Sequence, residues 1–281
     1  MIDLHIHTNA SDGQYSPAEI VQKAGEKGVS VLAVTDHDTV AGLADAAQAA
    51  ASAGITFVPG IELNIEWPTG EFHLLGLGIS AVSTSLTDII SSLQKNREER
   101  NRTIISRMRD DGVDASYEEL EALFPGRPIG RPHFAAYLVE KKLVRTRQQA
   151  FDKFLAQGRK WYVDRGGANL DEAVQAVNDS GGVPVIAHPL SLYLSWGRMD
   201  SVLEDIHSRG VEGLEAYHPG AREVDCKRLE TLARTHRFFV TAGSDFHGES
   251  IRADRKIGHT CGGEKIDDRF YYDELLPHLS R

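Results

Sequence analysis

The segment Ile2-Asp3-Leu4-His5-Ile6-His7 is a short β-rich run and predicts a strand. His5 and His7 are two residues apart, so on a strand both imidazoles point to the same face and can chelate one metal ion. Asp12 follows in a loop that contains Gly13. The segment therefore predicts a strand that leads directly into candidate metal ligands.

Similar β-rich runs alternate with helix-like segments over the first 80 residues, and the same alternation returns after Asn169. This pattern predicts βα units and a parallel sheet. The segment Ser16-Pro17-Ala18-Glu19 combines a capping serine, a proline and a glutamate at the third helical position, and it predicts a helix that runs to about Gly28. Seven strands, a number that suits a barrel, are expected at residues 2–7, 29–35, 55–62, 72–79, 183–187, 211–217 and 238–241.

Residues 81–168 lack the strand pattern and are expected to form charged helices, for instance over residues 86–110 and 117–123. We therefore expect an α/β protein with a barrel domain at residues 1–80 and 169–281 and a helical insertion domain at residues 81–168. Arg97, Arg100, Arg102 and Arg107 occur among glutamates in the first of these helices, which predicts a solvated face with local ion pairs.

The composition excludes several classes of protein. The 281 residues are 41% hydrophobic and carry a formal charge of -10, which disfavours a long basic groove for duplex DNA but is compatible with a small phosphorylated substrate. The apolar runs are strand-sized, and Met1 leads directly into a strand without a signal sequence, so we expect a cytoplasmic protein with no membrane contact. Cys226 and Cys261 form no CxxC pair and are taken as structural, and no obligate protein partner is evident.

Candidate metal ligands also occur at the later strand ends. A lone histidine is more often structural, and Asp36 and Asp38 can equally be turn or cap residues. Their gathering at successive strand ends favours a metal site, and nitrogen and oxygen donors suit manganese, iron or zinc. The segments are Thr35-Asp36-His37-Asp38, Pro59-Gly60-Ile61-Glu62, His73, Val185-Ile186-Ala187-His188-Pro189 and Ser244-Asp245-Phe246-His247.

These motifs closely resemble the polymerase and histidinol phosphatase (PHP) family of metallophosphoesterases. They occur in both halves of the chain and in the order of the family, beginning with Asp3-Leu4-His5-Ile6-His7-Thr8 and Asp12-Gly13. The resemblance implies a distorted seven-stranded (β/α)7 TIM-like barrel with a trinuclear centre. By similarity, one metal would be bound by His5, His7, Glu62 and Asp245, a second by Glu62, His73 and His188, and a third by Asp12, His37 and His247.

The expected mechanism is in-line attack on phosphorus by a hydroxide held between two metals, while the third metal clamps the phosphate. Asp12 replaces the histidine of some family members, which favours manganese over zinc at the third site. Beyond the hydroxide no catalytic residue is assigned. His218 lies at a predicted strand end and is a candidate donor to phosphate, with a capping role beside Pro219 as an equal alternative.

The insertion contains Gly130-Arg131-Pro132-His133, in which Arg131 is suited to grip a phosphate. From the residues alone, a loop arginine before a helix at Pro132 carries more weight. Family members of similar length with this Arg-Pro-His element look like nucleoside 3',5'-bisphosphate phosphatases, and some relatives degrade short RNA from the 5' end. The resemblance thus implies a hydrolase that converts adenosine 3',5'-bisphosphate to the 5'-monophosphate, with Arg131 and His133 in a substrate-capping insertion.

Two alternatives come from different classes. Histidinol-phosphate phosphatase shares the metal machinery but would need a site for one phosphate beside a cationic amine. A non-catalytic, metal-binding regulatory protein is the other, and the presence of competent donors at all nine positions argues against it. A polymerase proofreading module is less expected because no polymerase segment follows residue 281.

Overall fold

The computed structural model describes residues 1–125, 128–164 and 166–279. The chain divides into a barrel unit, formed by Met1–Ile90 and Gly167–Arg281, and an insertion unit, formed by Ser91–Gly166. The helix α3 (Thr84–Asp110) begins in the barrel unit and continues into the insertion unit. The first division therefore falls inside a helix, ten residues after the expected domain boundary.

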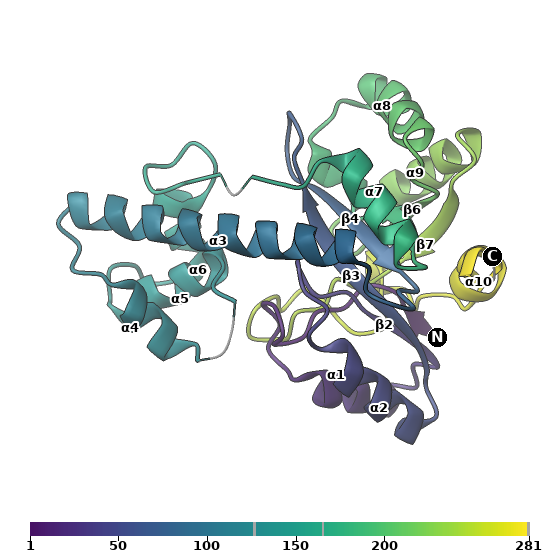
Figure 1. The fold of residues 1–281 in the computed structure, drawn as a ribbon, viewed down its shortest axis with the longest axis horizontal. Helices are drawn as coiled ribbons and strands as arrows, with labels where there is room; N and C mark the ends of the chain where they lie inside the picture. Colours follow the sequence, from purple (N-terminus) through teal and green to yellow (C-terminus); the bar gives the residue numbers. More distant parts are fainter. Residues whose placement is uncertain (126–127, 165, 280–281) are drawn as a thin grey trace. The chain divides into compact units, whose positions relative to one another are not determined.

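Seven strands form one sheet in chain order from β1 to β7 (Figure 1). Beyond the strand ends, Ile6 and Phe246 form a parallel bridge, and the N–H group of His7 donates to the carbonyl of Phe246 at 3.0 Å. These contacts bring the two edges of the sheet together, so the predicted α/β barrel is confirmed and is nearly closed. The strands are β1 (Ile2–Asp3), β2 (Val31–Val34), β3 (Thr56–Ile65), β4 (Phe72–Leu77), β5 (Val183–Ile186), β6 (Gly213–Tyr217) and β7 (Phe239–Ala242).

The direction of β4 corrects the expectation of a wholly parallel sheet. β4 is antiparallel to both β3 and β5, whereas the other neighbouring strands are parallel. Only residues 66–71 connect β3 to β4, and a parallel pair needs a crossover of about a dozen residues or more. The short connection therefore forces a hairpin, and His73 enters the barrel near the first residue of its strand instead of the last.

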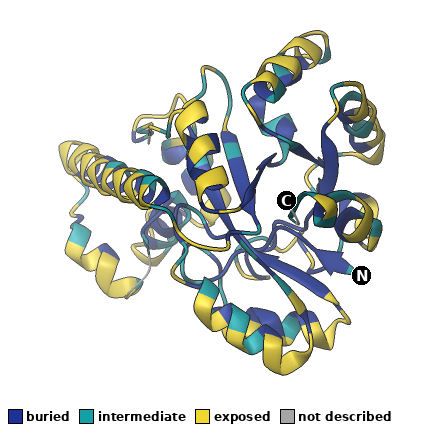
Figure 2. Ribbon diagram, turned by 45° about the vertical axis from the view of Figure 1, so that its right-hand side comes forward, coloured by how far each residue is buried: buried dark blue, intermediate teal, exposed yellow. Residues whose placement is uncertain are grey.

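Helices surround the sheet of the barrel unit, with apolar faces buried against the strands and outer faces exposed (Figure 2). The capping box of α1 is present as predicted: Ser16 Oγ accepts the N–H of Glu19, and Glu19 Oε2 accepts the N–H of Ser16. Cys226 and Cys261 are buried and free. The helices are α1 (Pro17–Glu26), α2 (Leu43–Ala53), α7 (Leu170–Asp179), α8 (Trp196–Ser208), α9 (Glu223–Thr235) and α10 (Leu276–Leu279), with the shorter turns η2 (Pro189–Leu192), η3 (Cys261–Gly263) and η4 (Phe270–Leu275).

The insertion unit is helical and has an apolar core of its own, which includes Met108, Phe134 and Trp161. Among the described residues, no helix is long and apolar enough to cross a membrane. Besides the greater part of α3, the unit contains α4 (Tyr117–Leu123), α5 (Arg131–Glu140), α6 (Arg147–Ala150) and the π-helical turn η1 (Phe151–Leu155).

Two arginines of α3 are not on a solvated face. Arg97 and Arg100 are buried, whereas Arg102 is exposed and pairs with Glu98 as expected. Arg97, Arg100 and the buried Ile104 follow the three-to-four-residue spacing of one helix face, so these arginines lie on the inward side of α3.

Candidate metal centre

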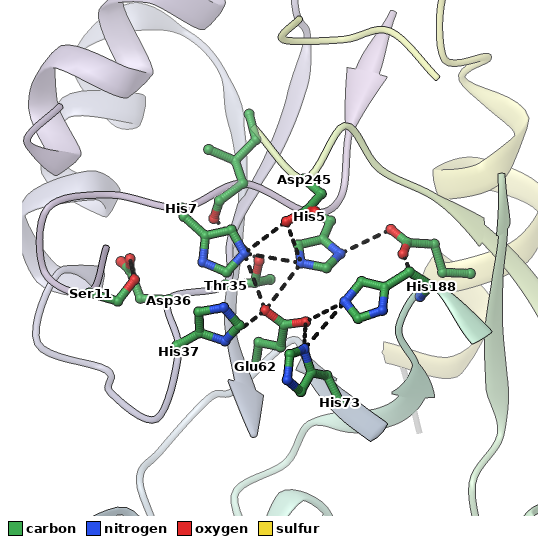
Figure 3. Close-up of polar contacts among 12 residues, drawn as sticks. His5, His7, Ser11, Thr35, Asp36, His37, Glu62, His73, His188 and Asp245 are labelled. Carbon is green, nitrogen blue, oxygen red and sulfur yellow. Dashed lines mark hydrogen bonds and ion pairs between the residues drawn. The ribbon is translucent and has the colours of Figure 1, made fainter. Parts of the chain in front are cut away.

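The nine predicted ligands all belong to the barrel unit, and most lie at the ends of its strands. Figure 3 labels all of them except Asp12 and His247. Glu62 and His73 share one face of the hairpin because Asn64 pairs directly with His73, and Glu62 is two residues from Asn64. The remaining ligands follow strands: His5, His7 and Asp12 come after β1, His37 after β2, His188 after β5, and Asp245 and His247 after β7.

Glu62 is fully buried at the centre of this group. Its two carboxylate oxygens face different histidines, so one side chain connects ligands from β1, β2, β4 and β5. Glu62 Oε2 lies 3.0 Å from His37 Nδ1, 3.2 Å from His7 Nε2 and 3.4 Å from His5 Nε2, and Oε1 lies 3.0 Å from both His73 Nδ1 and His188 Nε2.

The donor atoms of the cluster face one another in a way that fits bound cations. His5 Nε2 lies 3.1 Å from His7 Nε2, and His73 Nδ1 lies 3.3 Å from His188 Nε2. Among the described residues, His7 Nδ1, His37 Nδ1 and Glu62 Oε2 are buried and make no hydrogen bond of good geometry, although His37 Nδ1 and Glu62 Oε2 lie 3.0 Å apart. Converging, unsatisfied nitrogen and oxygen atoms are the environment that a divalent metal ion stabilises.

Four overlapping sets of donor atoms are close enough to hold a metal ion. Within each set the atoms lie within 4.8 Å of one another. Together the sets include all nine predicted ligands, but their grouping differs from the expected one. His73 and His188, expected on one ion, fall in different sets, with His37 and His5 respectively. His7 also joins the set around Asp12, and Glu62 is not in the set of His5, His7 and Asp245. The sets are His7, Asp12, His37 and His247; His5, His7 and Asp245; His5, Glu62 and His188; and His37, Glu62 and His73.

Burial and charge set the protonation of the cluster. Burial alone would lower the pKa of His5 and His7, but Glu215 and Glu62 raise the pKa of His5 well above its usual range, and Asp245 and Glu62 raise that of His7 to about 10. At His37 burial dominates and lowers the pKa to about 4. Protonation of this pair of rings, His5 and His7, whose Nε2 atoms lie 3.1 Å apart, thus reduces the repulsion among the carboxylates of the cluster.

In the carboxylates of the cluster, the effect of the neighbouring imidazoles on the pKa outweighs that of burial. Burial alone would raise the pKa values of Asp12, Glu62 and Asp245, but the surrounding imidazoles hold all three well below the ordinary range. These groups are therefore ionised and ready to bind a cation.

Asp245 presents its two oxygens to different surroundings. Oδ1 lies 3.4 Å from His7 Nε2, whereas Oδ2 lies 3.2 Å from both His218 Nε2 and Arg252 Nη1. His218 Nδ1 accepts the N–H of Gly220 at 3.0 Å, so a neutral His218 ring carries its proton on Nε2 and donates it to Asp245. His218 thus lies beside the cluster, as its predicted strand-end position implies.

The residues His188 and Asp245 adopt left-handed backbone conformations, with φ of +26° and +50°. Such conformations cost on the order of 1–3 kcal/mol each in side-chain-bearing residues and persist where surrounding contacts enforce them. The N–H of His188 donates to Glu215 Oε2 at 2.8 Å, and that of Asp245 donates to the carbonyl of His5 at 2.9 Å. These bonds hold the two residues at the cluster.

Sequence reasoning missed one carboxylate that supports the cluster, Glu215, and left open whether a second, Asp36, is a ligand or a turn or cap residue. Glu215 lies in β6, and its Oε1 is 3.0 Å from His5 Nδ1. Asp36 accepts the main-chain N–H and the hydroxyl of Thr8 at 2.8 and 2.7 Å and also the hydroxyl of Ser11, which fixes the loop that leads to Asp12. A charged residue inside an otherwise uncharged strand, Gly213–Tyr217, was the available signal for Glu215.

Arg131 and His133 lie in the insertion unit. Arg131 is the first residue of α5, and its guanidinium carbon is 5.4 Å from the ring centre of Tyr162. His133 is buried against Phe124, and its Nδ1 accepts the N–H of Gly130 at 2.9 Å. The His133 ring therefore caps its own helix through Nδ1, a role that the sequence did not predict.

Comparison with known proteins supports the family resemblance that the motifs indicate. The PHP domain model matches residues 3–167. The 3',5'-nucleoside bisphosphate phosphatase of Chromobacterium violaceum is 32% identical over 92% of this chain and 91% of its own length. The 5'-3' exoribonuclease Rnm of Salmonella typhimurium is 34% identical over 94% of this chain and 92% of its own length. A solved structure of a proposed metal-dependent phosphoesterase from Bifidobacterium adolescentis superimposes with a TM-score of 0.84 and 28% identity, and it covers 98% of this chain and 95% of its own.

Proposed function

Because the chain belongs to the PHP family, we propose that it is a metal-dependent phosphatase that removes the 3'-phosphate from nucleoside 3',5'-bisphosphates and leaves the nucleoside 5'-monophosphate. The observation that carries the proposal is the set of imidazoles that converges on the two oxygens of the buried Glu62. The substrate assignment is supported by the Chromobacterium violaceum relative, whose similarity extends over most of both chains.

We propose three divalent metal ions, with manganese as the preferred metal because all donors are nitrogen or oxygen atoms and three are carboxylates. When bound, the metals would supply Lewis acidity toward phosphoryl oxygens and would lower the pKa of a water molecule that serves as the nucleophile. We assign the ligands as the family resemblance implies: His5, His7, Glu62 and Asp245 for the first ion, Glu62, His73 and His188 for the second, and Asp12, His37 and His247 for the third. All nine contribute to the donor sets that converge in the structure, although those sets group them differently.

In this proposal the side chains of the protein position the metal ligands and neutralise charge. Glu62 holds ligands from several strands around one carboxylate. Both ring nitrogens of His218 are engaged, by Gly220 and by Asp245, so we assign His218 to the orientation of Asp245. Asp245 can then direct Oδ1 toward the cluster while Oδ2 remains held.

We assign recognition of the second phosphate to Arg131. Its guanidinium is always charged and offers two parallel donors to a phosphate, and the nearby ring of Tyr162 restricts its orientation. His133 has Nδ1 engaged with Gly130, so its contribution would be to set the first turn of α5, which carries Arg131.

A second candidate activity is removal of nucleotides from the 5' end of short RNA. The Salmonella typhimurium relative is a 5'-3' exoribonuclease, and its identity to this chain is similar to that of the bisphosphate phosphatase. Both reactions cleave a phosphoester of a nucleotide that carries a further phosphate, so one centre is chemically suited to both.

A phosphate-release and product assay with manganese-loaded protein tests the proposal. The substrates are adenosine 3',5'-bisphosphate, adenosine 3'- and 5'-monophosphates, a short 5'-phosphorylated RNA and histidinol phosphate. We expect the largest kcat/KM for the bisphosphate, with adenosine 5'-monophosphate as the product, and no turnover by Glu62→Gln.

Two outcomes would overturn this assignment. A larger kcat/KM for histidinol phosphate would place the chain among the histidinol-phosphate phosphatases. Stoichiometric manganese binding without turnover of any of these substrates would indicate a non-catalytic metal-binding protein.

A further inference from the structure

The loop after β7 carries two arginines close to the candidate metal centre. The N–H groups of Ile251 and Arg252 donate to the carbonyl of Gly248, and the N–H of Arg255 donates to the carbonyl of Arg252 at 3.2 Å. This turn places Arg252 Nη1 3.2 Å from Asp245 Oδ2. One arginine of the loop therefore already contacts a candidate ligand.

The second arginine, Arg255, is almost completely buried. Its side chain is 3% exposed, and Nε and Nη1 have no hydrogen-bond partner in the part of the chain that the structure describes. Asp254 Oδ2 lies 3.4 Å from Nη1, but that side chain is 66% exposed and well solvated. The guanidinium of Arg255 thus keeps most of its donors unused.

The guanidinium of Arg255 lies beside His218. A Cβ atom on Gly220 would come within 3.0 Å of Arg255 Nη2 and within 2.9 Å of the His218 ring. The absence of a side chain at Gly220 is therefore what allows the guanidinium to approach this part of the site. His218 Nε2 is in turn 3.2 Å from Asp245 Oδ2, the oxygen that Arg252 also contacts, so His218 lies next to both Arg255 and this carboxylate.

This arrangement is energetically unfavourable for the chain alone. A guanidinium stays charged, and burying it without hydrogen bonds is costly. Burial and the like charge of Arg252 lower the pKa of Arg255, while Asp245 and Asp254 attract the charge. An oxyanion between the two arginines would reduce their mutual repulsion and would accept hydrogen bonds from the unpartnered N–H groups.

We propose that Arg255 and Arg252 form an oxyanion subsite at the edge of the candidate metal centre, which binds the phosphate that is hydrolysed and then released. This rests on the proposed function of that centre. The hydrolysed phosphate is the favoured occupant because Arg252 contacts Asp245, whose other oxygen faces His7 in the cluster. Since Arg255 Nε and Nη1 are enclosed, the loop must shift slightly to admit the anion.

Calorimetric titration of inorganic phosphate into manganese-loaded protein tests the subsite directly. We expect Arg255→Met to raise the phosphate Kd by about tenfold or more, because it removes a charge-assisted pair of hydrogen bonds. Arg102→Met, which removes an exposed arginine that pairs with Glu98, should leave the Kd unchanged. Wild-type phosphate affinity in Arg255→Met would overturn the proposal.

A conservative variant keeps the test decisive if Arg255→Met does not fold. Arg255→Lys retains the buried charge but has no planar two-donor edge, so phosphate binding should weaken while manganese content and Tm match the wild type. Unchanged phosphate affinity in Arg255→Lys would also overturn the subsite, as would a loss of phosphate binding that is fully explained by a loss of manganese.

Kinetics identify which phosphate is bound. If Arg255 binds the hydrolysed phosphate, Arg255→Met lowers kcat/KM for p-nitrophenyl phosphate and for adenosine 3',5'-bisphosphate by similar factors. A loss confined to the bisphosphate would overturn this assignment, since the contact would then be to the second phosphate. The calorimetric result does not depend on the natural substrate, so failure of the subsite is distinguishable from failure of the proposed function.

Discussion

The carboxylate of Glu215 links the imidazole of His5 to the main chain of His188. Oε1 lies 3.0 Å from His5 Nδ1, and Oε2 accepts the N–H of His188 at 2.8 Å. A proton on Nδ1 is fixed by this contact, so in the deprotonated ring Nε2 faces the cluster with its lone pair free. Glu215 therefore orients candidate ligands that follow two different strands.

Glu215→Gln should weaken manganese binding by about 10- to 100-fold, the usual effect of losing a partner that orients a ligand. The amide oxygen of a glutamine can still accept from His5, but its NH2 group cannot accept the N–H of His188. Manganese titration by calorimetry measures the loss. The matched control is Glu212→Gln, which changes a glutamate paired with His278 in the same unit. Equal affinity in Glu215→Gln and the wild type would contradict the orienting role.

Gly243→Ala should disturb the same contact by steric means. A Cβ atom at this position would come within 2.2 Å of the His5 Cβ atom and 2.6 Å of Glu215 Oε1. We expect a fall in Tm together with weaker manganese binding, because overpacking costs about 1–3 kcal/mol. Gly197→Ala in α8 is the control, since a Cβ there meets no atom within 4 Å. If both variants behave alike, close packing at Gly243 does not matter for the site.

Metal binding at pH 7.5 should release protons, because the pKa values of His5 and His7 are raised and both rings must be deprotonated to bind metal. The folded-state pKa of His7 is about 10 against an ordinary 6.5. Its contribution to the stability of the metal-free protein is therefore full below pH 6.5 and is lost as the pH rises through 10.

Two measurements check this behaviour. Calorimetric titrations of manganese in buffers with different ionisation enthalpies give the number of protons released. Thermal unfolding between pH 6.5 and 10 should show a larger fall in Tm for the metal-free protein than for the manganese-loaded protein. Metal uptake without proton release would mean that the histidines are neutral before metal binds.

Arg131→Ala should raise KM for adenosine 3',5'-bisphosphate by about tenfold and leave hydrolysis of p-nitrophenyl phosphate nearly unchanged. The reason is that the aryl phosphate has no second phosphate for Arg131 to bind. Arg102→Ala serves as the control for removal of a positive charge from the insertion unit. Equal losses on the two substrates would argue against a role of Arg131 in substrate selection.

The positions of the strands and of the cluster residues could be predicted because both depend on local patterns. Strands need β-rich runs of limited length, and ligands at the ends of parallel strands meet at one end of a barrel. The direction of β4 could not be predicted from its own residues, since a β-rich run looks the same in either direction. The six-residue connection at 66–71 contained the missing information.

Other features depend on contacts between distant segments. Glu215 acts through His5, which is 210 residues away in the sequence, so nothing local distinguishes it from a surface glutamate except its place inside a strand. Arg97 and Arg100 were misassigned because the glutamates beside them were given more weight than their spacing from Ile104. Arg255 lies outside every motif and was not considered, since its significance comes from burial alone.

The bridge between Ile6 and Phe246 has a consequence for biosynthesis. Ribosomes release the chain from its amino end, so His5 and His7 emerge long before Asp245 and His247, with which they share donor sets. The complete cluster can form only after β7 has left the ribosome and joined β1. Metal binding by the complete set of donors would therefore begin only after residue 247 has left the ribosome.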